Sequence, residues 1–112
     1  MIKRDKQIVE HVIIHYKEVL ENMQLINSFE DFMNPVNKNI QKAIKMDVAQ
    51  IGENLIHLSE EAESQINAKD LKGIVDIRNH IVHGYLKVDN EIIYDSITND
   101  LPGLIEQIKN LK

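Results

Sequence analysis

The feature that most constrains this fold is an apolar stripe recurring every three or four residues. Such spacing places the apolar side chains on one face of an α-helix, where they can pack against a core. It predicts one long helix over residues 3–27, and a second over residues 35–64, where Asn34 and Pro35 form a typical helix start. The stripe positions are Ile8, Val12, Tyr16, Val19, Met23 and Ile26 in the first helix and Ile40, Ile44, Ile51, Leu55 and Leu58 in the second.

The rest of the chain continues the helical pattern. A polar break at residues 64–68 precedes a third helix, which Asp70 opens and Gly84 ends, as glycine commonly does. A short helix follows at about 91–96, and a final helix at about 99–111. Short connections between helices favour antiparallel neighbours. We therefore expect an all-α, up-and-down antiparallel bundle of four to five helices, as a single domain over residues 1–112.

Composition excludes several classes of function. The chain has no cysteine, so disulfides, thiolate metal sites and cysteine nucleophiles are ruled out. No apolar run approaches the roughly 20 residues of a membrane span, and the charged N-terminus does not resemble a signal peptide, so we expect a cytoplasmic protein. The net charge of −5 argues against a broad basic surface that coats nucleic acid. Any contact with RNA would be small and local.

The chemistry of the chain gathers in Arg78-Asn79-His80-Ile81-Val82-His83-Gly84-Tyr85. Arginine offers a planar, permanently charged donor fork for phosphate, and histidine can transfer a proton near neutral pH. At about 100° per residue, Arg78 and His83 lie about 140° apart around a continuous helix. Either the helix is distorted near its end, or two copies of the segment face each other. Tyr85 would share the face of Arg78 if the helical path continued.

A purely structural interpretation of the same residues stays open. Arg78 would pair with a carboxylate such as Asp76 or Glu53, and His83 would only cap the helix end. Gly52, inside the second helix, costs about 1 kcal/mol relative to alanine, so we expect a close approach of another helix there. Asp47 lies on the apolar stripe and should be either paired or near an end of the core.

Metal binding is less favoured by the sequence. The pairs His11 and His15 (i, i+4) and His80 and His83 (i, i+3) have spacings that ligands can adopt. Each pair lacks an evident third ligand, and such histidines are more often surface residues. We therefore predict no metal and no cofactor at the candidate site.

Over residues 3–110 the chain resembles the HEPN superfamily, and more narrowly the HepT-like toxins of HEPN/MNT toxin–antitoxin modules. Arg78, Asn79, His83 and Tyr85 match the family pattern of arginine, a polar residue, three further residues, histidine, any residue and tyrosine. The segments Ile51-Gly52-Glu53, Val88-Asp89 and Leu101-Pro102 add support. The resemblance implies a helical homodimer whose motif helices meet across the interface, which would resolve the angular offset.

The resemblance also implies a function. It indicates a metal-independent endoribonuclease in which Arg78 neutralises the scissile phosphate, His83 moves a proton, and Asn79 positions one of the reacting groups. A minimal nucleotidyltransferase antitoxin would neutralise it by transferring AMP to Tyr85. The alternative is a catalytically silent helical dimer that binds or regulates a partner nucleotidyltransferase, which the acidic charge of the chain favours.

Overall fold

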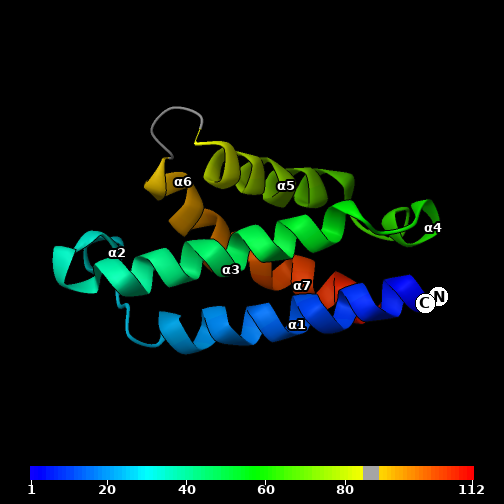
Figure 1. Ribbon diagram of the computed structural model, residues 1–112, viewed down its shortest axis with the longest axis horizontal. Helices are drawn as coiled ribbons and strands as arrows, with labels where there is room; N and C mark the ends of the chain where they lie inside the picture. The colour runs from blue at the N-terminus through cyan, green and yellow to red at the C-terminus, as the bar shows by residue number, and fades with distance from the viewer. Residues whose placement is uncertain (85–88) are drawn as a thin grey trace.

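The computed structural model describes residues 1–84 and 89–112, and within them it contains helices and no strand. The all-α fold class is therefore confirmed. Figure 1 shows the helices in order along the chain. They are α1 (Lys3–Met23), α2 (Phe29–Met33), the 3₁₀ turn η1 (Pro35–Asn37), α3 (Lys38–Ile56), α4 (Glu60–Glu63), α5 (Ala68–His83), α6 (Asn90–Asp95), the π-helical segment η2 (Ser96–Asp100) and α7 (Leu101–Lys109).

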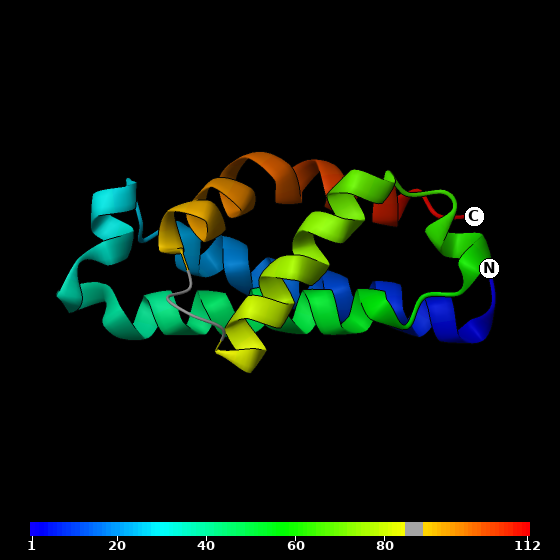
Figure 2. The same ribbon diagram turned by 90° about the horizontal axis from the view of Figure 1, so that it is seen from above.

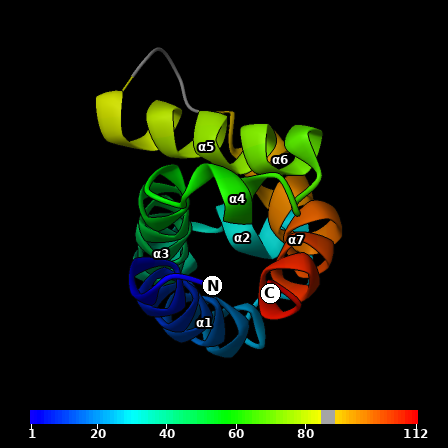
Figure 3. The same ribbon diagram turned by 90° about the vertical axis from the view of Figure 1, so that its right-hand side faces the viewer.

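Helix α3 is the centre of the arrangement. It makes its most extensive contacts with α1 on one side and with α5 on the other. Helices α1 and α3 run antiparallel, and the two chain termini lie at the same end of the molecule (Figure 1). Seen from above, α5 crosses α3 obliquely (Figure 2), and in the end view α1, α3 and α7 lie together beneath it (Figure 3). Residues 78–83 of the candidate motif thus lie on a helix that covers the bundle.

The core is formed by the apolar stripes that the sequence predicts. Each long helix contributes side chains that are less than a tenth exposed, and aliphatic residues dominate because aromatic residues are scarce. The main contributors are Ile8, Val12 and Val19 from α1, Ile44, Val48, Ile51 and Leu55 from α3, Leu71, Ile74 and Ile77 from α5, and Leu101, Leu104, Ile105 and Ile108 from α7. No helix within residues 1–84 and 89–112 is long and apolar enough to cross a membrane.

Two predicted helix ends are wrong. The first helix ends at Met23 rather than at residue 27, and the predicted helix over residues 35–64 is divided into η1, α3 and α4. The break falls before Ser59, whose backbone is extended. The side-chain oxygen of Ser59 accepts the backbone N–H of Ala62 and so caps the N-terminus of α4. Ser59 also donates its N–H and its hydroxyl to buried Asp5 of α1. A continuous helix would lose these contacts.

The later helices also differ in detail from the prediction. Asn67, not Asp70, is the N-cap of α5, because its side-chain oxygen accepts the backbone N–H of Asp70 at 3.0 Å. Gly84 does end the helix, with a left-handed φ of 58° that glycine adopts without penalty. The two predicted C-terminal helices are one continuous helical path from residue 90 to 109, joined through the π-helical segment η2.

Candidate functional site

Helix α5 is regular up to His83, so no distortion brings Arg78 and His83 together within one chain. Five residues of regular helix leave the two side chains about 140° apart around the axis. Arg78 faces α3, whereas His83 is exposed in the last turn. Of the two explanations that the sequence leaves open, the distorted helix is therefore wrong.

Gly52 of α3 lies directly beneath Arg78. A Cβ atom added at Gly52 would lie 2.5 Å from the Cβ of Arg78, 3.1 Å from its Cγ and 3.2 Å from the carbonyl oxygen of Ile74. No side chain fits at that separation, so only glycine permits the two helices to approach so closely. The close helix contact predicted at Gly52 is confirmed, and it determines where the arginine lies.

The guanidinium of Arg78 is held by two side chains. Its Nη2 forms an ion pair with Glu53 of α3 at 2.5 Å, and its Nη1 donates to the Oδ1 of Asn79 at 2.8 Å. The Arg78 side chain is 19% exposed and that of Glu53 is 42% exposed, so the pair lies at the edge of the α3–α5 contact. The Nε of Arg78 is buried and has no hydrogen-bond partner among the described residues. The arginine is thus oriented but not fully satisfied.

Helix geometry favours Glu53 over Asp76 as the partner of Arg78. Asp76 lies two residues before Arg78 on the same helix, so the two side chains do not face each other. Asp76 pairs instead with Lys72 one turn earlier on α5, at 2.8 Å. Glu53 also lies 3.5 Å from the Nε2 of His57. This second histidine was not predicted to belong to the site, although its i, i+4 spacing from Glu53 would have indicated the contact.

His83 and Tyr85 complete the sequence motif, but the structure describes only His83. His83 is the last residue of α5, and both it and His80 are exposed there. Tyr85 lies outside the described residues. The structure therefore brings Arg78 and Asn79 together, adds Glu53 to them, and leaves His83 on another side of the same helix.

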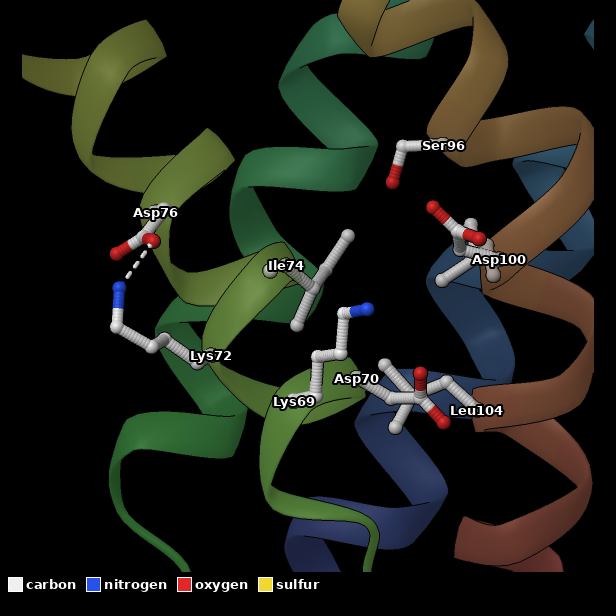
Figure 4. A pocket seen from close by; sticks show the side chains of 10 residues that line it. Lys69, Asp70, Lys72, Ile74, Asp76, Ser96, Asp100 and Leu104 are labelled. Carbon is white, nitrogen blue, oxygen red and sulfur yellow. Dashed lines mark hydrogen bonds and ion pairs between the residues drawn. The ribbon is translucent and has the colours of Figure 1, made fainter.

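A separate cavity of about 320 Å³ lies between the first half of α5 and the segment η2–α7. Figure 4 shows the side chains of Lys69, Ser96 and Asp100 directed toward its centre, whereas Lys72 turns away to pair with Asp76. None of the motif residues lines this cavity. Its mixture of lysines and aspartates does not favour a polyanion such as RNA.

The arrangement around Arg78 suits the binding of a phosphate group. A fixed cation with a partly exposed carboxylate partner and an amide beside it can neutralise the charge of a phosphate. The exposed histidine that could transfer a proton lies on another side of the same helix. Charge neutralisation and proton transfer are both used by phosphodiester-cleaving enzymes, so these residues remain candidates for such chemistry.

Comparison with known proteins identifies the family. The family model described as Ribonuclease HepT-like matches residues 12–111, and the chain belongs to this family. A protein of Methanocaldococcus jannaschii named "Putative RNase MJ0127" is 29% identical over 100 residues, covering 84% of this chain and 81% of the relative. One of Caldanaerobacter subterraneus subsp. tengcongensis named "Putative RNase TTE0752" is 28% identical over 111 residues, covering 98% and 96%. No solved structure matches the chain significantly. The ribonuclease class predicted from the motif is confirmed.

Proposed function

We propose that this ribonuclease is the toxin of a toxin–antitoxin pair and cleaves RNA internally without a metal ion. The observation that carries the proposal is the fixed guanidinium of Arg78, which Gly52, Glu53 and Asn79 hold at the edge of the α3–α5 contact. A phosphodiester bound there would meet a permanent cation with planar donors. Asn79, already in contact with the guanidinium, would orient the phosphate or the attacking hydroxyl.

The complete site requires two chains in this proposal. Arg78 and His83 diverge by about 140° on one regular helix, so a homodimer with facing α5 helices is the arrangement that juxtaposes them. Val82, next to His83, is 52% exposed, as expected for a helix with an apolar face outside its own bundle. A monomer at micromolar concentration in analytical ultracentrifugation would contradict this composite site.

The reaction follows from the groups present. The ribose 2′-oxygen attacks the adjacent phosphorus and loses its proton, the bond from phosphorus to the 5′-oxygen breaks, and that oxygen gains a proton. His83 serves in one of these proton transfers and its symmetry mate in the other, while Arg78 offsets the charge on the phosphate oxygens. The products are a 2′,3′-cyclic phosphate and a free 5′-hydroxyl.

The test is RNA cleavage by the purified protein. We expect activity to persist in EDTA, the products to carry a 2′,3′-cyclic phosphate, and His83→Ala to lower the rate by about 10²–10⁴-fold. His80→Ala is the matched control, because it removes an exposed histidine three residues earlier on the same helix. Loss of activity on chelation, or full activity of His83→Ala, would overturn the mechanism.

The antitoxin in this proposal is a minimal nucleotidyltransferase that modifies Tyr85. The phenol oxygen attacks the α-phosphate of ATP, pyrophosphate leaves, and the attached AMP adds a phosphate and a base close to Arg78 in sequence. Anionic bulk there would compete with RNA. Incubation with the nucleotidyltransferase and ATP should add about 329 Da per chain in intact-mass spectra of the wild type but not of Tyr85→Phe, as a covalent switch at this residue requires.

One observation favours a second candidate function. Glu53 already neutralises Arg78 within the chain, which is also what a catalytically silent dimer that binds or regulates a nucleotidyltransferase would show. Expression in cells separates the two candidates. Growth arrest by the wild type but not by His83→Ala supports the toxin, and no arrest by either supports the silent dimer.

A further inference from the structure

A second group of titratable side chains lies on the opposite side of α3 from Arg78. His15 and Glu18 come from α1, one turn apart, and Asp47 comes from α3. One nitrogen or oxygen atom from each of the three lies within 4.8 Å of the other two. The sequence predicted no third ligand for His15, because its candidate partner there was His11 on the same helix. The fold supplies a carboxylate from another helix instead.

Asp47 is the residue that requires an explanation. It lies on the core stripe of α3 and is only 8% exposed, where an ionised carboxylate is costly unless it is paired. It meets the Nδ1 of His15 at 2.9 Å. Glu18 brings a second carboxyl group to the same place, with an oxygen within 4.8 Å of the nearest ligand atoms of His15 and Asp47. Two carboxyl groups and one imidazole are thus gathered between α1 and α3.

We propose that His15, Glu18 and Asp47 bind one divalent transition-metal ion of the zinc type between α1 and α3. Imidazole nitrogen and carboxylate oxygen are both ordinary zinc ligands, and two carboxylates match the charge of the ion. Ligands about 2.0–2.2 Å from a tetrahedral ion lie about 3.4 Å from one another. The distance of 2.9 Å between the Nδ1 of His15 and the Oδ1 of Asp47 must therefore increase slightly when the ion binds. The carboxylate of Glu18 must move closer to both, which rotation of this exposed side chain allows.

The fourth coordination position would be open to solvent, because Glu18 lies on the exposed side of the group. The ion would connect α1 to α3 and contribute to stability, since a ligand that binds only the folded state stabilises it. It would contact neither Arg78 nor α5. EDTA should therefore lower the melting temperature and leave RNA cleavage intact, which separates this proposal from the proposed mechanism.

The experiment is titration of the full chain with Zn²⁺ after EDTA treatment and desalting, by calorimetry and by thermal unfolding. We expect one ion per chain and a higher melting temperature, with no effect of Mg²⁺ at equal concentration, because Mg²⁺ prefers six oxygen ligands. Glu18→Gln and Asp47→Asn should each lower zinc affinity by at least about 10-fold, since replacing even a residue that only hydrogen-bonds to a metal ligand lowers affinity by that much.

Two matched controls make the test decisive. Glu21→Gln removes one exposed carboxylate one turn further along α1, and His11→Gln removes the other histidine that can pair with His15. Both variants should bind zinc as the wild type does. Zinc binding that survives Glu18→Gln, that is lost in His11→Gln, or that is absent from the wild type would overturn the proposal. Glu18 is exposed, so its variant tests the site even if Asp47→Asn does not fold.

Discussion

Arg78 and Asp5 are both charged residues at helix contacts, and they are satisfied to different degrees. Asp5 is 2% exposed and accepts two hydrogen bonds from Ser59, from the N–H at 3.0 Å and from the hydroxyl at 2.6 Å. Arg78 is 19% exposed, pairs with a carboxylate that is itself 42% exposed, and keeps a buried Nε without a partner among the described residues.

The difference is the one we expect between a charge that serves the fold and a charge that serves the proposed site. Asp5 is a buried charge with a hydrogen bond to each of its oxygens; it connects α1 to the start of α4 and is not accessible to a ligand. A charge whose partner faces solvent can exchange that partner for a phosphate, at the cost of a less complete local network. The comparison therefore predicts opposite consequences for variants at the two residues.

The largest expected effect is on cleavage. Arg78→Ala should lower the rate by about 10²–10³-fold, the usual cost of removing a donor that stabilises developing charge. Asp5→Asn should leave the rate per folded molecule unchanged. Arg78→Lys should recover only part of the activity, because lysine keeps the charge and loses the planar fork. Cleavage of labelled RNA, normalised to the folded fraction by circular dichroism, measures all three. Wild-type activity of Arg78→Ala would remove this residue from the site.

The next effect concerns the support beneath Arg78. Gly52→Ala should lower the free energy of unfolding by about 1–3 kcal/mol, because the added methyl group meets the Arg78 Cβ at 2.5 Å. Gly73→Ala on α5 is the matched control. Its added Cβ meets nothing within 4 Å, and the gain in helix propensity should raise stability by up to about 1 kcal/mol.

Urea denaturation measures the free energy of unfolding of both glycine variants and shows whether it falls in Gly52→Ala and rises in Gly73→Ala. The cleavage rate of Gly52→Ala should fall as well, since Arg78 must move away from Glu53 and Asn79. If Gly52→Ala is as stable as Gly73→Ala and cleaves as well as the wild type, the close approach of α3 and α5 does not position the arginine.

The helices could be predicted from the sequence because the apolar residues that become buried recur every three or four positions along each helix. Each core stripe and each of the signals at Asn34 and Gly84 depends on residues within one or two turns, and both signals appear as a cap or an end in the structure. The break before Ser59 could not be predicted this way. The apolar stripe continues through Leu58, and the partner that favours the break is Asp5, 54 residues away in the sequence.

For the candidate site, too, local features could be predicted from the sequence and tertiary contacts could not. The types of residue in the motif indicated phosphate chemistry, and the spacing of Lys72 and Asp76 would have left Glu53 as the partner of Arg78. The contact that holds the arginine depends on how closely α3 and α5 cross, which is a tertiary property. The group of His15, Glu18 and Asp47 was missed for the same reason, because its members belong to two helices that are distant in sequence.

The smallest expected effect is the pH dependence that Asp5 contributes. Burial alone would raise the pKa of Asp5, but the hydrogen bonds from Ser59, together with the positive charges of Arg4 and the N-terminal amine, outweigh it and lower the pKa below its ordinary value of 3.8. A carboxyl group with a lowered pKa in the folded state stabilises the protein above its ordinary pKa, and this contribution is lost as the pH falls through the folded value. Asp5→Asn, which keeps one acceptor oxygen, should therefore cost about 0.5–1.5 kcal/mol at neutral pH.

The difference between the wild type and Asp5→Asn should shrink as the pH falls below the ordinary pKa of Asp5, where the wild type loses the same charge. Urea denaturation of both proteins at neutral and at acid pH measures it. Glu10→Gln is the control, because it removes an exposed carboxylate from the same helix and should show no such change. A difference that stays constant down to the lowest pH would mean that Asp5 contributes shape and not charge. The comparison between Asp5 and Arg78 would then fail for Asp5, because its negative charge would not stabilise the fold.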